Sequence, residues 1–185
     1  RLGLDVPVDH RALIEQSQTD ARKLLQEQRF NPASVMRLWK NLGDDYFIRE
    51  NAKTIAWHTR TILNHQVDGP LVAISETSFS AFEGGTQVFV YTQDKANLFA
   101  ALCAILGQLH LDIQDARIIT TEDGYSMDTF VVLDNSGNTI NQTPALLEQL
   151  KQRLTKALQY PDEFAYIVQQ RQPRIHKLFN QSASV

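Results

Sequence analysis

The spacing of the apolar residues changes near residue 70, and this change most constrains the fold. Before it, apolar side chains recur at the three- and four-residue intervals of amphipathic helices. Asp68-Gly69-Pro70 is a turn signal, and residues 86–91 beyond it are β-branched and aromatic, as in a strand. We therefore predict an α+β chain, with a helical segment over residues 1–70 and a sheet-containing domain over residues 71–185.

The helical segment is predicted to contain three helices. The first covers residues 9–28, and Asn31-Pro32 starts the second, because Asn is a favourable N-cap and Pro is tolerated in the first helical turn. Gly43 is expected to cap the end of that helix, and a third helix covers residues 52–64 with Asn51 as its cap. Three short helices with few aromatic anchors make a thin core, so we expect part of their apolar surface to contact an upstream domain.

The second domain is predicted to begin with a short strand, Leu71–Ser75, and a loop that contains Phe79 and Phe82. Strand, helix, strand, strand and helix follow, which are the first five elements of a ferredoxin-like βαββαβ unit. Their predicted ranges are 86–91, 98–109, 112–121, 125–133 and a helix that starts at Thr143-Pro144. We expect the sixth element, a strand, to begin near Ser182 and to be cut by the chain end. Such a cut would leave one sheet position open to a neighbouring chain.

Composition argues against several classes of protein. The chain has 185 residues and a net charge of −3, without the basic surface that nucleic-acid binding requires. No apolar run approaches the roughly 20 residues of a membrane span, and no signal-peptide core follows Arg1, so we expect neither insertion nor secretion. Because the chain begins with Arg1, we expect it to be a piece of a longer protein. The single cysteine, Cys103, falls within an apolar helical pattern, which is typical of a buried thiol and fits a reducing cytoplasm.

Two groups of motifs, kept in a fixed order, identify a family. The first group contains Leu42–Arg49 and Ile55–Arg60. The second group contains Gly85–Tyr91, Asp94, Leu98–Ala100, Asp115–Thr120, Asp123-Gly124 and Met127–Asp134. Over most of residues 20–180, these motifs resemble the C-terminal part of the bifunctional protein-PII uridylyltransferase/uridylyl-removing enzymes, which are bacterial glutamine sensors.

The resemblance implies both the domain organisation and the function. Residues 1–70 would connect a His-Asp hydrolase domain to residues 71–185, which would form the first of two ACT domains, small ligand-binding modules. The parent enzyme would attach UMP to protein PII when glutamine is scarce and remove it when glutamine is abundant, with Mg²⁺ or Mn²⁺ in its catalytic domains. The motifs of those domains are missing here, so we assign no catalytic residue and no cofactor to this chain. The expected partners are L-glutamine, PII through the parent, the second ACT domain and a second copy joined through the sheet.

The turn after the first strand of the βαββαβ unit is the predicted effector site. ACT domains bind an amino acid between this turn and a paired domain, and the free N–H groups at a helix start suit a carboxylate. The turn comprises Asp94, Lys95, Ala96, Asn97, Leu98 and Phe99. The family usually has Pro and Gly where this chain has Ala96 and Asn97. Asn adopts the left-handed conformation that Gly supplies, at some cost, but the departure equally allows a structural module without a ligand.

Other polar residues have simpler interpretations than a catalytic or metal site. The adjacent carboxylates Asp44 and Asp45 suit helix capping or salt bridges better than metal binding. His58 and His65 could share a helix face, but two imidazoles without a third ligand fall short of a zinc site.

A few further polar residues remain. Ser75, Ser78 and Ser80 lack the G-x-S-x-G elbow of a hydrolase. Strand alternation places Asp115 and Arg117 on one face, where a cross-strand ion pair is favoured over a polar ligand cluster that includes Asp128.

Two other functions stay open. The chain could be a structural ACT module that only mediates domain pairing or oligomerisation, which the Asn at position 97 favours. Amino-acid-regulated enzymes of biosynthesis and alarmone metabolism also carry ACT modules, although Leu42–Arg49 and Ile55–Arg60 argue against them.

Overall fold

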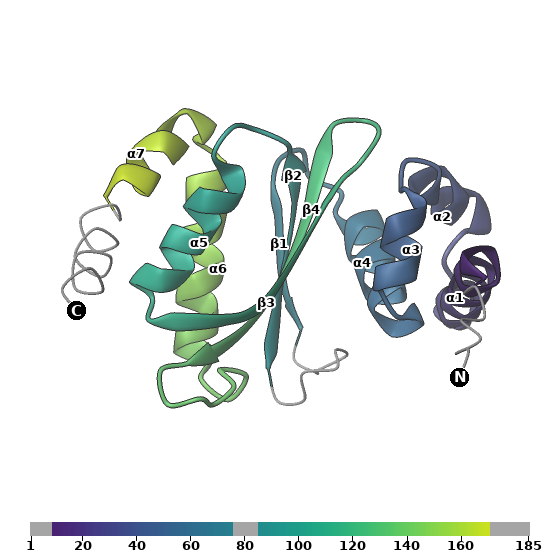
Figure 1. Cartoon of the computed structure of the whole chain (residues 1–185), viewed down its shortest axis with the longest axis horizontal. Helices are drawn as coiled ribbons and strands as arrows, with labels where there is room; N and C mark the ends of the chain where they lie inside the picture. Colours follow the sequence, from purple (N-terminus) through teal and green to yellow (C-terminus); the bar gives the residue numbers. More distant parts are fainter. Residues whose placement is uncertain (1–8, 76–84, 171–185) are drawn as a thin grey trace, which may run out of the picture. The chain divides into compact units, whose positions relative to one another are not determined.

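The computed structural model describes residues 9–75 and 85–170, which form two compact units. The first unit extends to Gln66 and includes Thr121–Asp123, and the second contains the other residues. The division between the units therefore precedes the predicted boundary at residue 70. Figure 1 follows the chain through both units.

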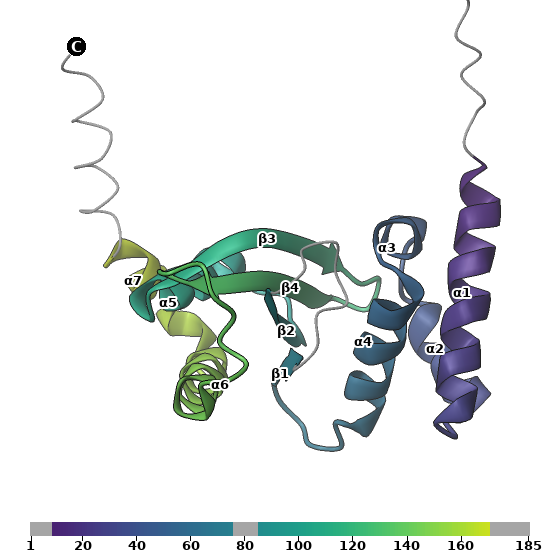
Figure 2. The ribbon, with the colours of Figure 1, turned by 90° about the horizontal axis from the view of Figure 1, so that it is seen from below.

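Four helices form the first unit. They are α1 (His10–Glu27), α2 (Pro32–Trp39), α3 (Asp44–Arg49) and α4 (Ala52–Asn64). Side-chain caps fix the starts of three of them: the oxygens of Asp9, Asn31 and Asn51 accept backbone N–H groups at the beginning of α1, α2 and α4. The three predicted helices are confirmed, and Figure 2 shows α1 and α4 running side by side.

The helix α3 was not predicted, and Gly43 has a different role from the one expected of it. The second helix ends at Trp39, and Gly43 is the N-cap of α3, with an extended backbone at φ −76°. Asp44 and Asp45 form the first turn of this short helix, where negative charge is favourable against the helix dipole. The predicted C-cap at Gly43 is therefore wrong, because the glycine precedes a helix of only six residues, which is too short to show a helical pattern in the sequence.

Aromatic rings fill the core of the first unit. Phe47 packs edge-on against Trp39 and Tyr46, with ring centroids 5.4 Å and 5.2 Å away. The Trp39 Nε1–H group donates to Thr59 Oγ1 at 2.9 Å, and the Tyr46 hydroxyl lies 2.7 Å from His58 Nδ1. The expectation of few aromatic anchors is wrong, because α3 brings two further rings into the core.

A four-stranded antiparallel sheet forms the centre of the second unit. Its strands are β1 (Leu71–Ser75), β2 (Thr86–Gln93), β3 (Leu111–Thr120) and β4 (Tyr125–Asp134), in the order β1-β2-β4-β3. The helices α5 (Leu98–Gln108) and α6 (Pro144–Leu158) cover one face of the sheet (Figure 1). The predicted α+β, ACT-like fold is confirmed.

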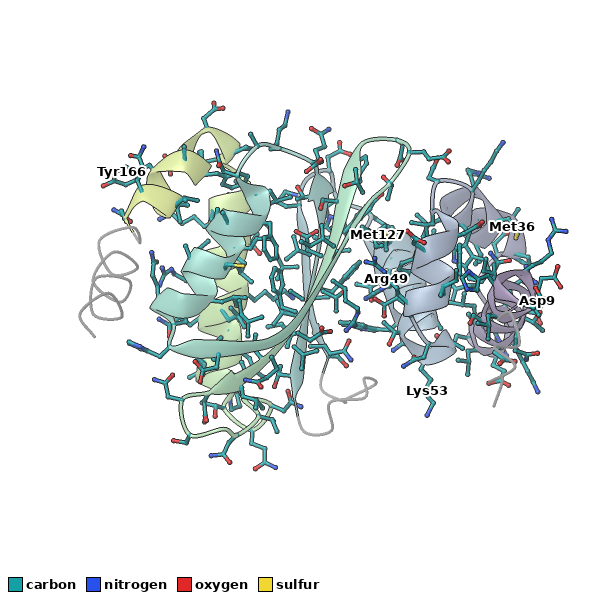
Figure 3. The ribbon with its side chains drawn as sticks, viewed as in Figure 1. Asp9, Met36, Arg49, Lys53, Met127 and Tyr166 are labelled. Carbon is teal, nitrogen blue, oxygen red and sulfur yellow. The ribbon has the colours of Figure 1, made fainter. Side chains whose placement is uncertain are left out.

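Strand alternation places the core of the second unit between the sheet and these helices. Val88 and Val90 of β2 and Phe130 and Val132 of β4 point toward the helices and are fully or almost fully buried. The helices contribute the other side of this core, including Leu102, Ile105, Leu106, Leu150 and Leu154. Met127 projects from the opposite face of the sheet (Figure 3).

The strand β1 occupies the sheet position that was expected to be open. It pairs with β2 from Leu71 opposite Tyr91 to Ser75 opposite Gln87. In a βαββαβ unit, the final strand would pair with the first strand at this place. Here the strand that precedes the unit takes that place, so the prediction of an open position is wrong. Phe79, Phe82 and the strand expected near Ser182 lie outside the described residues.

Two short helical elements follow α6, where no element was predicted. They are the 3₁₀ turn η1 (Pro161–Glu163) and the helix α7 (Phe164–Gln169). Phe164 is buried in the core and α7 packs against α5, whereas Tyr166 projects outward (Figure 3). None of the helices formed by the described residues is long and apolar enough to span a membrane.

Candidate functional site

The predicted effector turn connects β2 to α5 and is held by backbone hydrogen bonds. The Asp94 N–H group donates to the Gly124 carbonyl at 2.9 Å, and the Leu98 N–H group donates to the Lys95 carbonyl at 3.2 Å. Asn97 has φ +66° and ψ +9°, the left-handed conformation that was expected of it. Its carbonyl then accepts the Ala101 N–H group at 2.9 Å, which starts α5. The turn therefore keeps, with Asn, a conformation that usually favours Gly.

The six predicted site residues fall into two groups. Asp94, Lys95, Ala96 and Asn97 are exposed to solvent. Leu98 is buried in the core, and Phe99 stacks on Phe130 with ring centroids 5.8 Å apart and planes 10° from parallel. The first four residues are thus available to a ligand, whereas Leu98 anchors the helix and Phe99 keeps 38% of its surface exposed.

A cavity of about 400 Å³ lies beside this turn, and we call it the end cavity. Its polar lining comes from the loop before β1, the end of β2, the turn, the start of β4 and the end of α6: Asp68, Thr92, Gln93, Lys95, Tyr125 and Gln159. Its apolar lining comes from Pro70, Leu158, Pro161 and Phe164. Of the six predicted residues, only Lys95 lines this cavity. The sequence did not indicate the other polar groups, because they come from four further segments that are far apart in the chain.

Asp128 is a buried carboxylate on the helix-covered face of β4. Its Oδ1 accepts the Ser126 hydroxyl at 2.6 Å, whereas its Oδ2 has no hydrogen-bond partner and is fully buried. Burial raises the pKa of Asp128 to about 6; the Ser126 hydrogen bond opposes this rise, and the nearby Asp94 carboxylate adds to it. The predicted effector turn therefore lies near a buried carboxyl group whose pKa is raised.

The suggested cluster of Asp115, Arg117 and Asp128 does not form. Asp115 and Arg117 do share a strand face and form an ion pair, but the pair runs along β3 rather than across strands. Arg117 lies opposite Thr129, and Ile118 lies opposite Asp128, so alternation puts Asp128 on the other face of the sheet.

The remaining candidates are structural where they are described. His58 is buried against Tyr46, whereas His65 is the C-cap after the last residue of α4, so the two do not share a helix face. Ser75 is a buried strand residue, and Ser78 and Ser80 lie outside the described residues. Cys103 is half-buried against the core of the second unit. Across residues 9–75 and 85–170, no group of three or more His, Cys, Asp or Glu side chains is placed to hold a metal ion.

Comparison with known proteins connects this structure to a family of enzymes. Residues 9–61 match the family model described as the uridylyltransferase GlnD fifth domain. The chain is 44% identical over 181 residues to a bifunctional uridylyltransferase/uridylyl-removing enzyme of Pseudomonas putida (strain GB-1), an alignment that covers 97% of this chain and 20% of the relative. It is 46% identical over 180 residues to the enzyme of the same name from Ectopseudomonas mendocina (strain ymp), with the same coverage of 97% and 20%. The chain thus spans about a fifth of the length of the curated relatives it matches.

Proposed function

The chain belongs to the family of bifunctional uridylyltransferase/uridylyl-removing enzymes, and on this premise we propose that it is a regulatory, glutamine-sensing part of such an enzyme. In this proposal the chain itself carries no catalytic site. The whole enzyme, in the cytoplasm, would attach UMP to protein PII when glutamine is scarce and remove it when glutamine is abundant. The identity of 44% over 97% of the chain is the observation that carries the proposal.

The geometry of the effector turn supports a sensing role. The left-handed Asn97 lets the chain enter α5 directly from β2, and it leaves the side chains of Asp94–Asn97 exposed. A helix start that faces solvent offers N–H donors and a positive dipole end, both of which suit the carboxylate of an amino acid. The adjacent end cavity supplies further polar groups.

A sensor must couple binding to a choice between two catalytic states. Glutamine can shift that choice only if it binds the chain more tightly in one state than in the other, since equal affinities shift nothing. The proposed role therefore requires that the second unit differ between the two states. The resemblance also implies Mg²⁺ or Mn²⁺ for the whole enzyme, but the described residues provide no group of candidate ligands, and we assign that ion no ligand here.

The test is removal of the second unit from the full-length enzyme. Because β1 pairs with β2 and α7 packs against α5, the deletion should cover residues 67–170 so that no strand or helix is left without its partners. Uridylylation and deuridylylation of PII are then measured with and without L-glutamine. We expect both activities to persist while their response to glutamine disappears, and a retained response would contradict the proposal.

A second candidate function is domain pairing without a ligand. The strand β3 lies at the edge of the sheet over ten residues, and Ile118 within it is 41% exposed. An edge strand of this length presents backbone groups that another ACT domain or a second copy could pair with. The variant Ile118→Lys of the full-length enzyme tests this role. Loss of assembly together with an unchanged response to glutamine would favour domain pairing as the role of the module.

A further inference from the structure

The end cavity has a charge arrangement that the effector turn alone does not explain. Asp68 contributes a carboxylate from the loop before β1, and Lys95 contributes an ammonium group from the turn. Among the described residues, no ion pair joins either group to the other or to a third side chain. Two opposite charges therefore face one cavity without neutralising each other, which suits a ligand that carries both charges.

The uncharged residues that line the cavity limit which class of ligand fits it. Thr92, Gln93 and Gln159 offer a hydroxyl and two primary amides, which donate and accept hydrogen bonds. Leu158 and Phe164 are buried and form an apolar wall that an aliphatic stem can cover. A cavity of about 400 Å³ is within the range of small-molecule sites. These features together fit an α-amino acid with a polar, uncharged side chain.

We propose that the end cavity, rather than the outer surface of the Asp94–Phe99 turn, is the amino-acid site of this module. The inference rests on the proposed sensing function and assigns it to specific groups. The α-ammonium of the ligand pairs with Asp68, its α-carboxylate pairs with Lys95, and its side chain lies between Gln159 and the apolar wall.

The position of Asp68 in the chain suggests how ligand binding in the end cavity could be transmitted to the first unit. The main segment of the first unit ends at Gln66 and the second unit begins at Val67, so Asp68 lies directly after this junction in the chain. The residues around Asp68 are exposed to solvent, with Val67 72% exposed. Gly69 has φ +123°, a backbone conformation that other residues rarely adopt. A ligand that holds Asp68 to the turn therefore restrains the chain beside this junction.

The test uses the 185-residue chain and isothermal titration with L-glutamine up to millimolar concentration. The Asp68→Asn and Lys95→Ala variants each remove one charge from the cavity. The matched controls Asp112→Asn and Lys151→Ala remove the same charges from exposed positions of the same unit that do not line the cavity. We expect each cavity variant to weaken glutamine binding by roughly five-fold or more, the size of a partly exposed ion pair, and the controls to leave it unchanged.

Ligand analogues assign each charge to its partner. Glutaramic acid lacks the α-ammonium group, and glutamine α-amide lacks the α-carboxylate. Wild-type chain should bind both more weakly than glutamine. Asp68→Asn should lose only the discrimination against glutaramic acid, and Lys95→Ala only the discrimination against the α-amide.

The outcomes separate this inference from the proposed function. If glutamine binds, and its affinity is lowered by Asn97→Val or Phe99→Ala but not by the cavity variants, the cavity assignment is overturned and glutamine sensing stands. If a different amino acid binds through Asp68 and Lys95 while glutamine does not, the cavity assignment stands and glutamine sensing is overturned. If no amino acid binds the wild-type chain, both are overturned.

Discussion

At the scale of single residues, two positions near the effector turn depart from ordinary preferences. Asn97 adopts a left-handed backbone that costs most L-residues roughly 1–2 kcal/mol, and its short polar side chain reduces that cost. Asp128 keeps a carboxyl group in the core with only Ser126 as its hydrogen-bond donor. Asn97 is the N-cap of α5, and Asp128 on β4 lies close enough to Asp94 of the turn for the two carboxylates to interact.

Asp128 makes the stability of the second unit depend on pH. Its pKa rises from the usual 3.8 to about 6 in the folded chain because burial disfavours the charged form. Below pH 3.8 both the folded and the unfolded chain hold the proton, and between 3.8 and 6 only the folded chain does. The free energy of unfolding therefore falls as the pH rises through this window, by up to roughly 3 kcal/mol, and its Asp128 contribution is constant above it.

The variant Asp128→Asn tests this pH dependence. It should remove the fall in unfolding free energy between pH 4 and 6 and raise stability at pH 7.5 by roughly 1–2 kcal/mol, since an amide is cheaper to bury than a carboxylate. Urea unfolding at a series of pH values measures both effects, with Asp112→Asn as the exposed control. An unchanged pH slope in Asp128→Asn would show that another group titrates.

At the scale of elements, polar groups determine how the helices of the first unit pack. The Thr59 hydroxyl donates to the Ile55 carbonyl of its own helix and accepts the Trp39 Nε1–H group from α2. It therefore joins α4 to α2 inside a buried core. Thr61, two residues further along α4, donates only to the Trp57 carbonyl and is half-buried.

These two threonines form a matched pair for mutation. Thr59→Val keeps the shape of the side chain but leaves the buried Trp39 N–H group without its acceptor, which should cost roughly 1–3 kcal/mol of stability. Thr61→Val should change stability by less than about 0.5 kcal/mol, because no donor loses its acceptor. Denaturant unfolding followed by tryptophan fluorescence compares them. Equal effects would mean that the Trp39–Thr59 bond contributes little.

At the scale of the whole molecule, the second unit has its own core and its own four-stranded sheet. The cluster of buried apolar residues between Val72 and Phe164 belongs to this unit alone. A domain with a closed core of this kind folds independently in general. The strand β1 is essential to that closure because Val72 is 4% exposed and pairs with β2.

Two shortened chains test this dependence on β1. A chain of residues 67–185 should fold alone, whereas a chain of residues 76–185 should lose at least roughly 3 kcal/mol of stability through the lost burial of Val72 and Ile74. Circular dichroism and dispersion of the amide NMR signals report the folded state. Residues 67–170 serve as the control, because they keep every described element of the unit. Equal stability of the 67–185 and 76–185 chains would mean that another segment can replace β1.

The sequence by itself determined the fold class and most of the elements, although not the short helices α3 and α7. Caps such as Asn31-Pro32 and Asn51, alternation in β2 and β4, and the Asp-Gly turn at residues 123–124 are local signals, and local signals set local structure. The left-handed turn at Asn97 was also expected from its residue type. Only the tertiary structure decided which strand lies beside β2, because strand pairing depends on residues far apart in the chain. It likewise decided that Asp128 is buried away from Arg117, and that Asp68, Lys95 and Gln159 line one cavity, since no pattern of spacing relates three separate segments.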